Sequence, residues 1–219
     1  FNNDSQRVRG SLYVSKTEAQ TGAILTGAEF TLYGDAQMQT VYGKLTEENG
    51  SYTIENLPVG TYYLKETAAP AGYELNATVY KVVVASDNAN GNPSSSIAVV
   101  TVTAQGVNNQ NTADDPLVVE DAVFTGSLTV TKDWNDDSNR DNLRGDVTVT
   151  LYENRGGEWT ATTQQKTLTY DKATASNAQV TFENLPLMFN GEAIRYKVVE
   201  NKLPGYADGY TGNDVALLG

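Results

Sequence analysis

Three ionisable residues, Lys16, Glu66 and Asp121, each end a short series in which every second residue is apolar. Side chains alternate between the two faces of a β-strand, so residues two positions apart share a face. The apolar residues that share a face with the three are Leu12 and Val14, Tyr62 and Leu64, and Leu117 and Val119. The pattern therefore directs a lysine, a glutamate and an aspartate toward a protein core.

Burying an unpaired charge is costly, so three such residues fit one core only where their side chains meet. Desolvation favours the neutral forms of an amine and of a carboxylic acid. A neutral lysine amine held against a protonated aspartic acid can attack the carboxyl carbon. A neighbouring glutamate can hydrogen-bond the carbonyl and relay protons while water leaves. The product would be an uncharged amide between two side chains.

Other interpretations of these residues exist. A lysine or glutamate at the end of a strand is often a solvated edge charge. Asp121 could cap a linker turn. The side chain that the lysine attacks would then be that of Asn108, Asn109 or Asn111. These three asparagines have no inward apolar neighbours, which favours Asp121.

The elements that would carry these residues are short β-strands. The 219-residue chain is 39% hydrophobic and contains 13 tyrosines, and no long stretch has helical apolar spacing, which favours an all-β fold. Gly- and Asn-rich stretches at 88–96 and 106–115 predict surface loops. The expected strands are 10–17, 28–33, 39–45, 51–55, 61–66, 79–84, 97–103, 116–121, 127–133, 146–153, 165–170, 178–183 and 195–200.

The chain contains an internal repeat. The run Gly10–Lys16 returns as Gly126–Lys132, and Ile54–Pro58 returns as Phe182–Pro186, in the same order. The sequence thus predicts two tandem β-sandwich domains, residues 1–125 and 126–219.

Several of these runs resemble one family. Lys65–Tyr73, with the sequence KETAAPAGY, Thr26–Tyr33 and the turn Asn56–Tyr62 resemble collagen-adhesin B-type (SpaA-like) domains, and the likeness covers nearly all of both repeats. The resemblance implies an inverse immunoglobulin-like sandwich with an intramolecular lysine–asparagine or lysine–aspartate isopeptide bond. By position, Lys16 would be the amine, Glu66 the catalytic acid and Asp121 the acceptor. An aspartate acceptor implies loss of water rather than ammonia.

The second repeat departs from this pattern. Lys132 and Glu200 stand at the matching positions, but no final strand carrying an acceptor is evident before Gly219. Asn213 is a late asparagine, and it comes early for that role. An unreacted Lys132–Glu200 pair is the alternative interpretation.

Composition excludes several function classes. The chain has no cysteine or histidine, so disulfides, thiolate metal sites and His-containing triads are ruled out. A net charge of −12 disfavours nucleic acid and anionic membranes as partners. The stretch 133–141 has oxygen ligands at alternate positions, but Ser138 replaces the glycine of a calcium loop and Arg144 its bidentate glutamate. A solvated loop is therefore favoured, and no metal or cofactor is expected.

The resemblance implies a structural, non-enzymatic role. We expect a stalk or shaft module on the cell-wall-anchored, extracellular surface of a Gram-positive bacterium, and the start Phe1-Asn2-Asn3-Asp4 suggests a piece of a longer polypeptide. Its expected partners are neighbouring domains of the same protein, other pilin subunits or a host matrix ligand. The alternative is an adhesive module that binds a host matrix protein or glycan directly.

Overall fold

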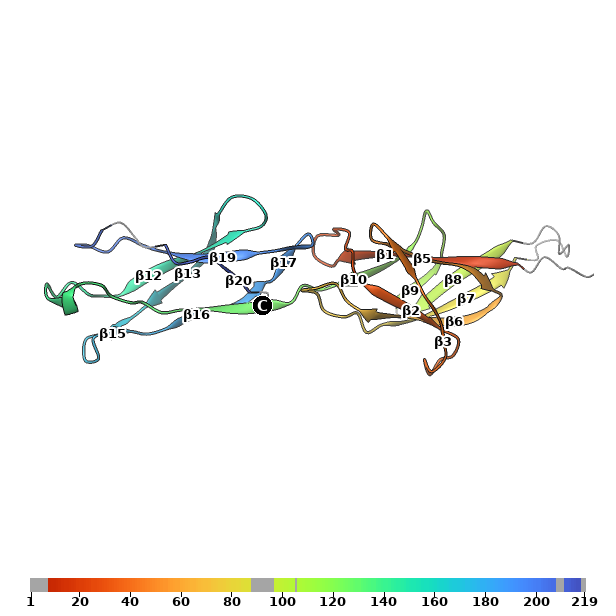
Figure 1. Cartoon of the computed structure of the whole chain (residues 1–219), viewed down its shortest axis with the longest axis horizontal. Coiled ribbons are helices and arrows are strands. Elements are labelled where there is room, and N and C mark those ends of the chain that lie inside the picture. Colours follow the sequence, from red (N-terminus) through yellow and green to blue (C-terminus); the bar gives the residue numbers. More distant parts are fainter. Residues whose placement is uncertain (1–7, 88–96, 105, 208–210, 218–219) are drawn as a thin grey trace, which may run out of the picture. The chain divides into compact units, whose positions relative to one another are not determined.

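The chain folds into two compact units, Phe1–Ala122 and Val123–Gly219. The structure, a computed structural model, describes residues 8–87, 97–104, 106–207 and 211–217 (Figure 1). The predicted all-β fold with two tandem sandwich domains is confirmed. No helix in the described part of the chain is long and apolar enough to cross a membrane.

The first unit is built from two sheets. In spatial order, the first sheet holds β10 (Leu117–Asp121), β1 (Arg9–Glu18), β5 (Ser51–Pro58) and β4 (Thr46–Glu48). The second sheet holds β3 (Val41–Lys44), β2 (Glu29–Tyr33), β6 (Gly60–Ala68), β7 (Val79–Ser86), β8 (Ala98–Ala104) and β9 (Val107–Gln110). Both sheets contribute side chains to one apolar core, as expected of a β-sandwich.

Strand β1 lies between two partners. It pairs in parallel with β10, where Lys16 lies opposite Val119 and Glu18 opposite Asp121. Its other edge pairs antiparallel with β5. From Gly10 to Glu18, every second side chain of β1 is buried, because these side chains face the core between the sheets.

The second unit repeats part of this arrangement. Its two largest sheets are β11–β16 and β13–β12–β19–β20, and they enclose a second apolar core. The strands are β11 (Thr125–Val130), β12 (Val147–Asn154), β13 (Thr160–Leu168), β16 (Val180–Pro186), β19 (Arg195–Glu200) and β20 (Val215–Ala216). Two small hairpins, β14 (Tyr170–Asp171) with β15 (Ser176–Asn177) and β17 (Met188–Phe189) with β18 (Glu192–Ala193), and the 3-10 turn η2 (Asp137–Asn139) complete it.

Two details differ from the sequence-based expectation. Residues 107–110, expected to be part of a loop, form β9 and pair with β8. A short late strand that was not expected from the sequence, β20, pairs with β19. The expected loop at 88–96 lies outside the described residues.

Candidate functional site

The first unit brings Lys16, Glu66 and Asp121 together in its core. The Lys16 side chain is 0% exposed, and its Nζ lies 3.1 Å from Oε1 of Glu66. The same Nζ contacts Oδ1 of Asp121, whose side chain is also 0% exposed. The contacts join the ends of three strands, β1, β6 and β10, across 105 residues of sequence between Lys16 and Asp121.

The two carboxyl groups of this cluster have different surroundings. Oε2 of Glu66 accepts a 2.8 Å hydrogen bond from the backbone N–H of Asn76. Burial nevertheless raises the pKa of Glu66 above its ordinary value, which favours the neutral acid. Oδ2 of Asp121 is buried and has no hydrogen-bond partner among the described residues. Such an oxygen is unfavourable in a protein core.

The chemical consequence is that a lysine nitrogen touches a carboxyl group in a dry environment. Phe30 closes one side, with its ring centroid 5.9 Å from Nζ of Lys16. The rings of Phe30 and Tyr52 pack edge to face, with 4.9 Å between their centroids. These aromatic rings exclude water, which suits a reaction that releases water.

A further buried acid, Glu18, was not singled out from the sequence. It shares the inward face of β1 with Lys16 and is 2% exposed. Its Oε2 accepts a 2.7 Å hydrogen bond from the hydroxyl of Tyr73. Its parity with Lys16 was the available signal, but the expected strand ended at residue 17.

The alternative acceptors of the first domain occupy other places. Asn108 and Asn109 belong to β9. Asn111 is buried, donates to the carbonyl of Tyr13 at 2.7 Å and accepts from its N–H at 2.8 Å. Its amide therefore pairs with the backbone of β1.

The second unit holds the pair Lys132 and Glu200 at the equivalent place. Nζ of Lys132 lies 3.0 Å from Oε2 of Glu200, and the side chains are 18% and 11% exposed. This pair lines a groove of about 640 Å³ together with Trp134 and Asn213. Nζ of Lys132 also lies 4.6 Å from the ring centroid of Trp134, a cation–π contact.

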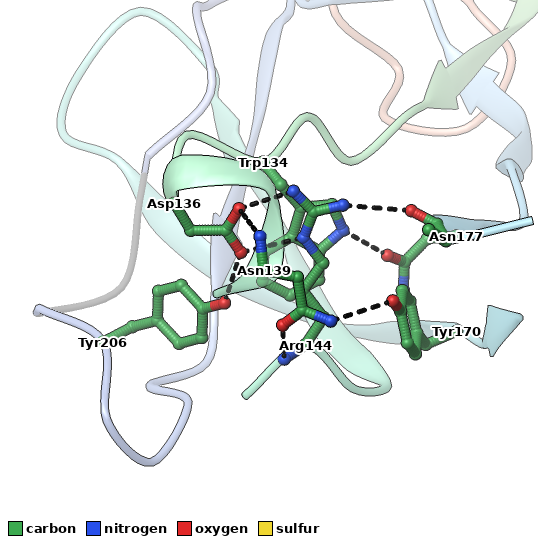
Figure 2. Close-up of polar contacts among 8 residues, drawn as sticks. Trp134, Asp136, Asn139, Arg144, Tyr170, Asn177 and Tyr206 are labelled. Carbon is green, nitrogen blue, oxygen red and sulfur yellow. Dashed lines mark hydrogen bonds and ion pairs between the residues drawn. The ribbon is translucent and has the colours of Figure 1, made fainter. Parts of the chain in front are cut away.

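Beside this groove, a polar network surrounds Asp136 (Figure 2). Arg144 donates to both of its carboxylate oxygens, and the Tyr206 hydroxyl donates at 2.7 Å. The guanidinium holds the pKa of Asp136 well below its ordinary range, whereas burial and the bond to Asp136 raise the pKa of Tyr206 to about 12. The indole N–H of Trp134 donates a 2.7 Å hydrogen bond to Oδ1 of Asn177 (Figure 2).

This network bears on the calcium-loop interpretation of residues 133–141. The carboxylate of Asp136 already has a cationic partner in Arg144. Within the described residues, no group of three or more acidic side chains gathers in a way that could hold a metal ion.

The chain is thus a tandem β-sandwich protein in which each domain places a lysine against one or two carboxyl groups. Family models match both units: residues 10–97 match SpaA, a prealbumin-like fold domain, and residues 128–216 match the Cna protein B-type domain. Residues 10–97 therefore form a SpaA-type domain and residues 128–216 a Cna B-type domain, in keeping with the resemblance found in the sequence.

Three solved structures are similar to this chain at low sequence identity. The Bacillus anthracis TIE protein is 23% identical with a TM-score of 0.47, over 94% of this chain and 32% of that one. A C-terminal fragment of the pilus adhesin SpaC from Lactobacillus rhamnosus GG is 17% identical with a TM-score of 0.42, over 93% and 78%. The major pilin of Streptococcus pyogenes is 14% identical with a TM-score of 0.37, over 95% and 92%. The chain thus spans about a third of the length of the Bacillus anthracis protein. No match is found among curated proteins.

Proposed function

We propose that this chain is a structural stalk module of a Gram-positive surface adhesin or pilin, whose first unit is locked by an isopeptide bond between Lys16 and Asp121. The observation that carries the proposal is the buried contact between Nζ of Lys16 and the Asp121 carboxyl, with Glu66 beside it. Membership of the SpaA and Cna B-type families supports the role on the cell surface.

The bond would form by condensation. Neutral Nζ of Lys16 attacks Cγ of Asp121, a C–N bond forms, and one C–O bond of the carboxyl breaks. Glu66, whose pKa burial raises, hydrogen-bonds the carbonyl oxygen in its protonated form. It then gives its proton to the departing hydroxyl, which leaves as water, and takes up the proton lost by nitrogen. The reaction also removes the unpartnered buried oxygen of Asp121.

The role of the bond would be mechanical. In the described part of the first unit, β1 is the first strand and β10 the last, and the bond would join them. A pulling force that enters at β1 and leaves at β10 is then carried by covalent bonds. The chain between Lys16 and Asp121, which are 105 positions apart, is not stretched. By the loop-entropy relation for cross-links, such a closure would add about 4–5 kcal/mol to stability.

In this proposal the module is extracellular and acts as a spacer beside neighbouring domains or other pilin subunits. The reaction turns over once, so the chain would not be an enzyme. The Lys132–Glu200 pair of the second unit is a second candidate cluster whose acceptor is not identified.

The test is the intact mass of the purified chain under denaturing conditions. We expect a mass one water below the sequence mass, and a cross-linked peptide containing Lys16 and Asp121. Asp121→Asn should change the loss to one ammonia, and Lys16→Arg should restore the full mass. A full, uncorrected mass of the native chain would reject the self-locking part of the proposal.

A further inference from the structure

We propose that Asn76 is a positioning residue for the Lys16–Asp121 bond, because it ties the acceptor strand β10 to the carboxyl group of Glu66. The inference rests on the proposed function and names a further residue on which that reaction depends. Asn76 was not singled out from the sequence. It lies in the connection between β6 and β7, residues 69–78.

The connection 69–78 passes from one sheet of the first unit to the other. It begins after β6 and returns to the same six-stranded sheet at β7. Between these strands, the hydroxyl of Tyr73 donates to Oε2 of Glu18 on β1 at 2.7 Å. The N–H of Glu74 donates to the carbonyl of Ala122, just after β10, at 2.8 Å. The connection therefore contacts the ends of both strands that carry the reacting side chains.

Asn76 makes hydrogen bonds to three parts of the unit. Its backbone N–H donates to Oε2 of Glu66 at 2.8 Å, and its Nδ2 donates to the carbonyl of Glu120 on β10 at 3.0 Å. Its Oδ1 accepts from the N–H of Thr78 at 2.9 Å, a local bond typical of asparagine in turns. The side chain thus meets a carbonyl on one side and an N–H on the other, which an amide satisfies and a carboxylate cannot.

The backbone around the acceptor is held on both edges of its strand. The carbonyl of Asp121 accepts from the N–H of Ala19, just after β1, at 2.9 Å. The carbonyls before and after it, those of Glu120 and Ala122, accept from the connection. Successive carbonyls of a strand point to opposite edges, and β10 is the outermost strand of its sheet. The connection therefore supplies the partners of the outer edge at the acceptor.

The acceptor depends on this backbone support, since its own carboxyl group has few contacts. Oδ1 of Asp121 contacts Nζ of Lys16, and Oδ2 has no hydrogen-bond partner among the described residues. The position of the carboxyl carbon is therefore set by β10, and Asn76 holds β10 beside Glu66. A displacement of about 1 Å between reacting groups can slow a reaction by about 10²-fold.

The test compares the rates of bond formation in variants of the whole chain. Unreacted chain, recovered unfolded and identified by its full sequence mass, is refolded by dilution, and the loss of one water is followed by intact mass. We expect Asn76→Ala to form the Lys16–Asp121 bond about 10-fold to 10²-fold more slowly than the native chain. Asn76→Asp should also be slow, because it keeps an acceptor for Thr78 but cannot donate to the carbonyl of Glu120.

A control variant separates position from stability. Asp35→Ala removes three hydrogen bonds to backbone N–H groups in a loop of the same unit, so it should lower stability without slowing the reaction. Stability is measured by calorimetry in a Lys16→Met background, in which the bond cannot form. Rates are compared at a temperature at which the first unit is folded. Within a fully folded population a change in stability alone does not alter the rate, whereas a displaced acceptor does.

The inference fails if either Asn76 variant loses water at the native rate, or if it is slowed no more than Asp35→Ala at an equal loss of stability. It also fails if neither Asn76 variant refolds, because Asn76 would then be needed for folding itself. In each of these results the native chain still loses one water. A native chain that keeps its full mass would instead reject the proposed function, and the inference with it.

Discussion

At the scale of single residues, the core of the first unit holds a buried lysine that contacts the carboxyl groups of Glu66 and Asp121. Lys16 and Asp121 are fully buried, yet only one oxygen of Asp121 has a partner among the described residues. Buried ion pairs are often no more stable than apolar replacements. The proposed condensation would replace the buried ionisable pair by a neutral amide, and the part that Glu66 plays in it can be tested separately.

Glu66→Gln should slow formation of the Lys16–Asp121 bond by about 10²–10⁴-fold, the usual contribution of a general acid–base. Glutamine keeps the size and can still accept from the N–H of Asn76, but it cannot relay protons. The measurement is the fraction of chain with the native mass deficit during refolding. Glu29→Gln, an exposed acid, is the control and should behave like the native chain. Equal rates in Glu66→Gln and the native chain would contradict the proposed role.

Asp136 should make the second unit less stable in acid. Its pKa is lowered in the folded state, so the stabilisation is fully present above the unfolded value, about 3.9, and is lost as pH falls through the folded value. Asp136→Asn should therefore lower stability at neutral pH, and the difference from the native chain should shrink below about pH 4. Both tryptophans lie in the second unit, so their fluorescence follows its unfolding. Asp141→Asn, on an exposed acid, should leave the profile unchanged; a constant difference for Asp136→Asn at all pH values would reject the argument.

At the scale of elements, a tight hairpin supports the lysine-bearing strand. Asn49 and Gly50 join β4 to β5 with φ of 51° and 79°, as in the type I′ turns that fit strand twist. The carbonyl of Gly50 accepts a 3.2 Å hydrogen bond from the N–H of Lys16. The turn is thus part of the surroundings of the site.

Gly50→Ala should destabilise the first unit more than Gly27→Ala does. Both glycines have positive φ, and an alanine there costs about 1–2 kcal/mol. A Cβ at Gly50 would also lie 2.2 Å from Cγ2 of Ile24 and 2.9 Å from the carbonyl oxygen of Leu25, whereas Gly27 has open space. Overpacking of this kind adds about 1–3 kcal/mol. Calorimetry that separates the transitions of the two units measures the difference, and equal melting temperatures would refute it.

At the scale of the whole molecule, the two units differ in how a pulling force would act on them. In the proposed function the contact between Lys16 and Asp121 in the first unit becomes covalent, whereas the acceptor for Lys132 in the second unit is not identified. In this proposal the first domain is cross-linked between its first and last strands, and no such cross-link is identified in the second.

Pulled by its two ends, the chain should show extension of the second unit but not of the segment between Lys16 and Asp121. A covalent bond does not yield at forces that unfold a sandwich, because unfolding breaks only non-covalent contacts. Single-molecule force spectroscopy of the native chain should therefore give one unfolding extension, and Lys16→Arg should give two. Two extensions from the native chain would contradict a bond between Lys16 and Asp121.

Much of the candidate site could be predicted because its signals are local. The alternation of apolar residues before Lys16, Glu66 and Asp121 is a property of each strand, and burial at one side follows from it. The repeat of Gly10–Lys16 at Gly126–Lys132 likewise predicted two copies of one domain, and the family models match both units.

Features that depend on pairing could not be predicted in this way. Residues 107–110 are mostly polar and Asn-rich, and they form β9 by pairing with the edge of β8. Asn111 is buried because Tyr13, 98 residues away, supplies both hydrogen-bond partners. Glu18 belongs to the inward face only because β1 continues one residue beyond its expected end.

The sequence by itself determined the strand class, the two repeats and the direction in which Lys16, Glu66 and Asp121 point, because side-chain parity is decided within a strand. Only the tertiary structure decided that Lys16 contacts both Glu66 and Asp121, and that one oxygen of Asp121 has no hydrogen-bond partner in the part of the chain that the structure describes. The physical reason is that contact and desolvation are properties of strands brought together across about a hundred residues of chain, and no local pattern encodes which neighbour is present.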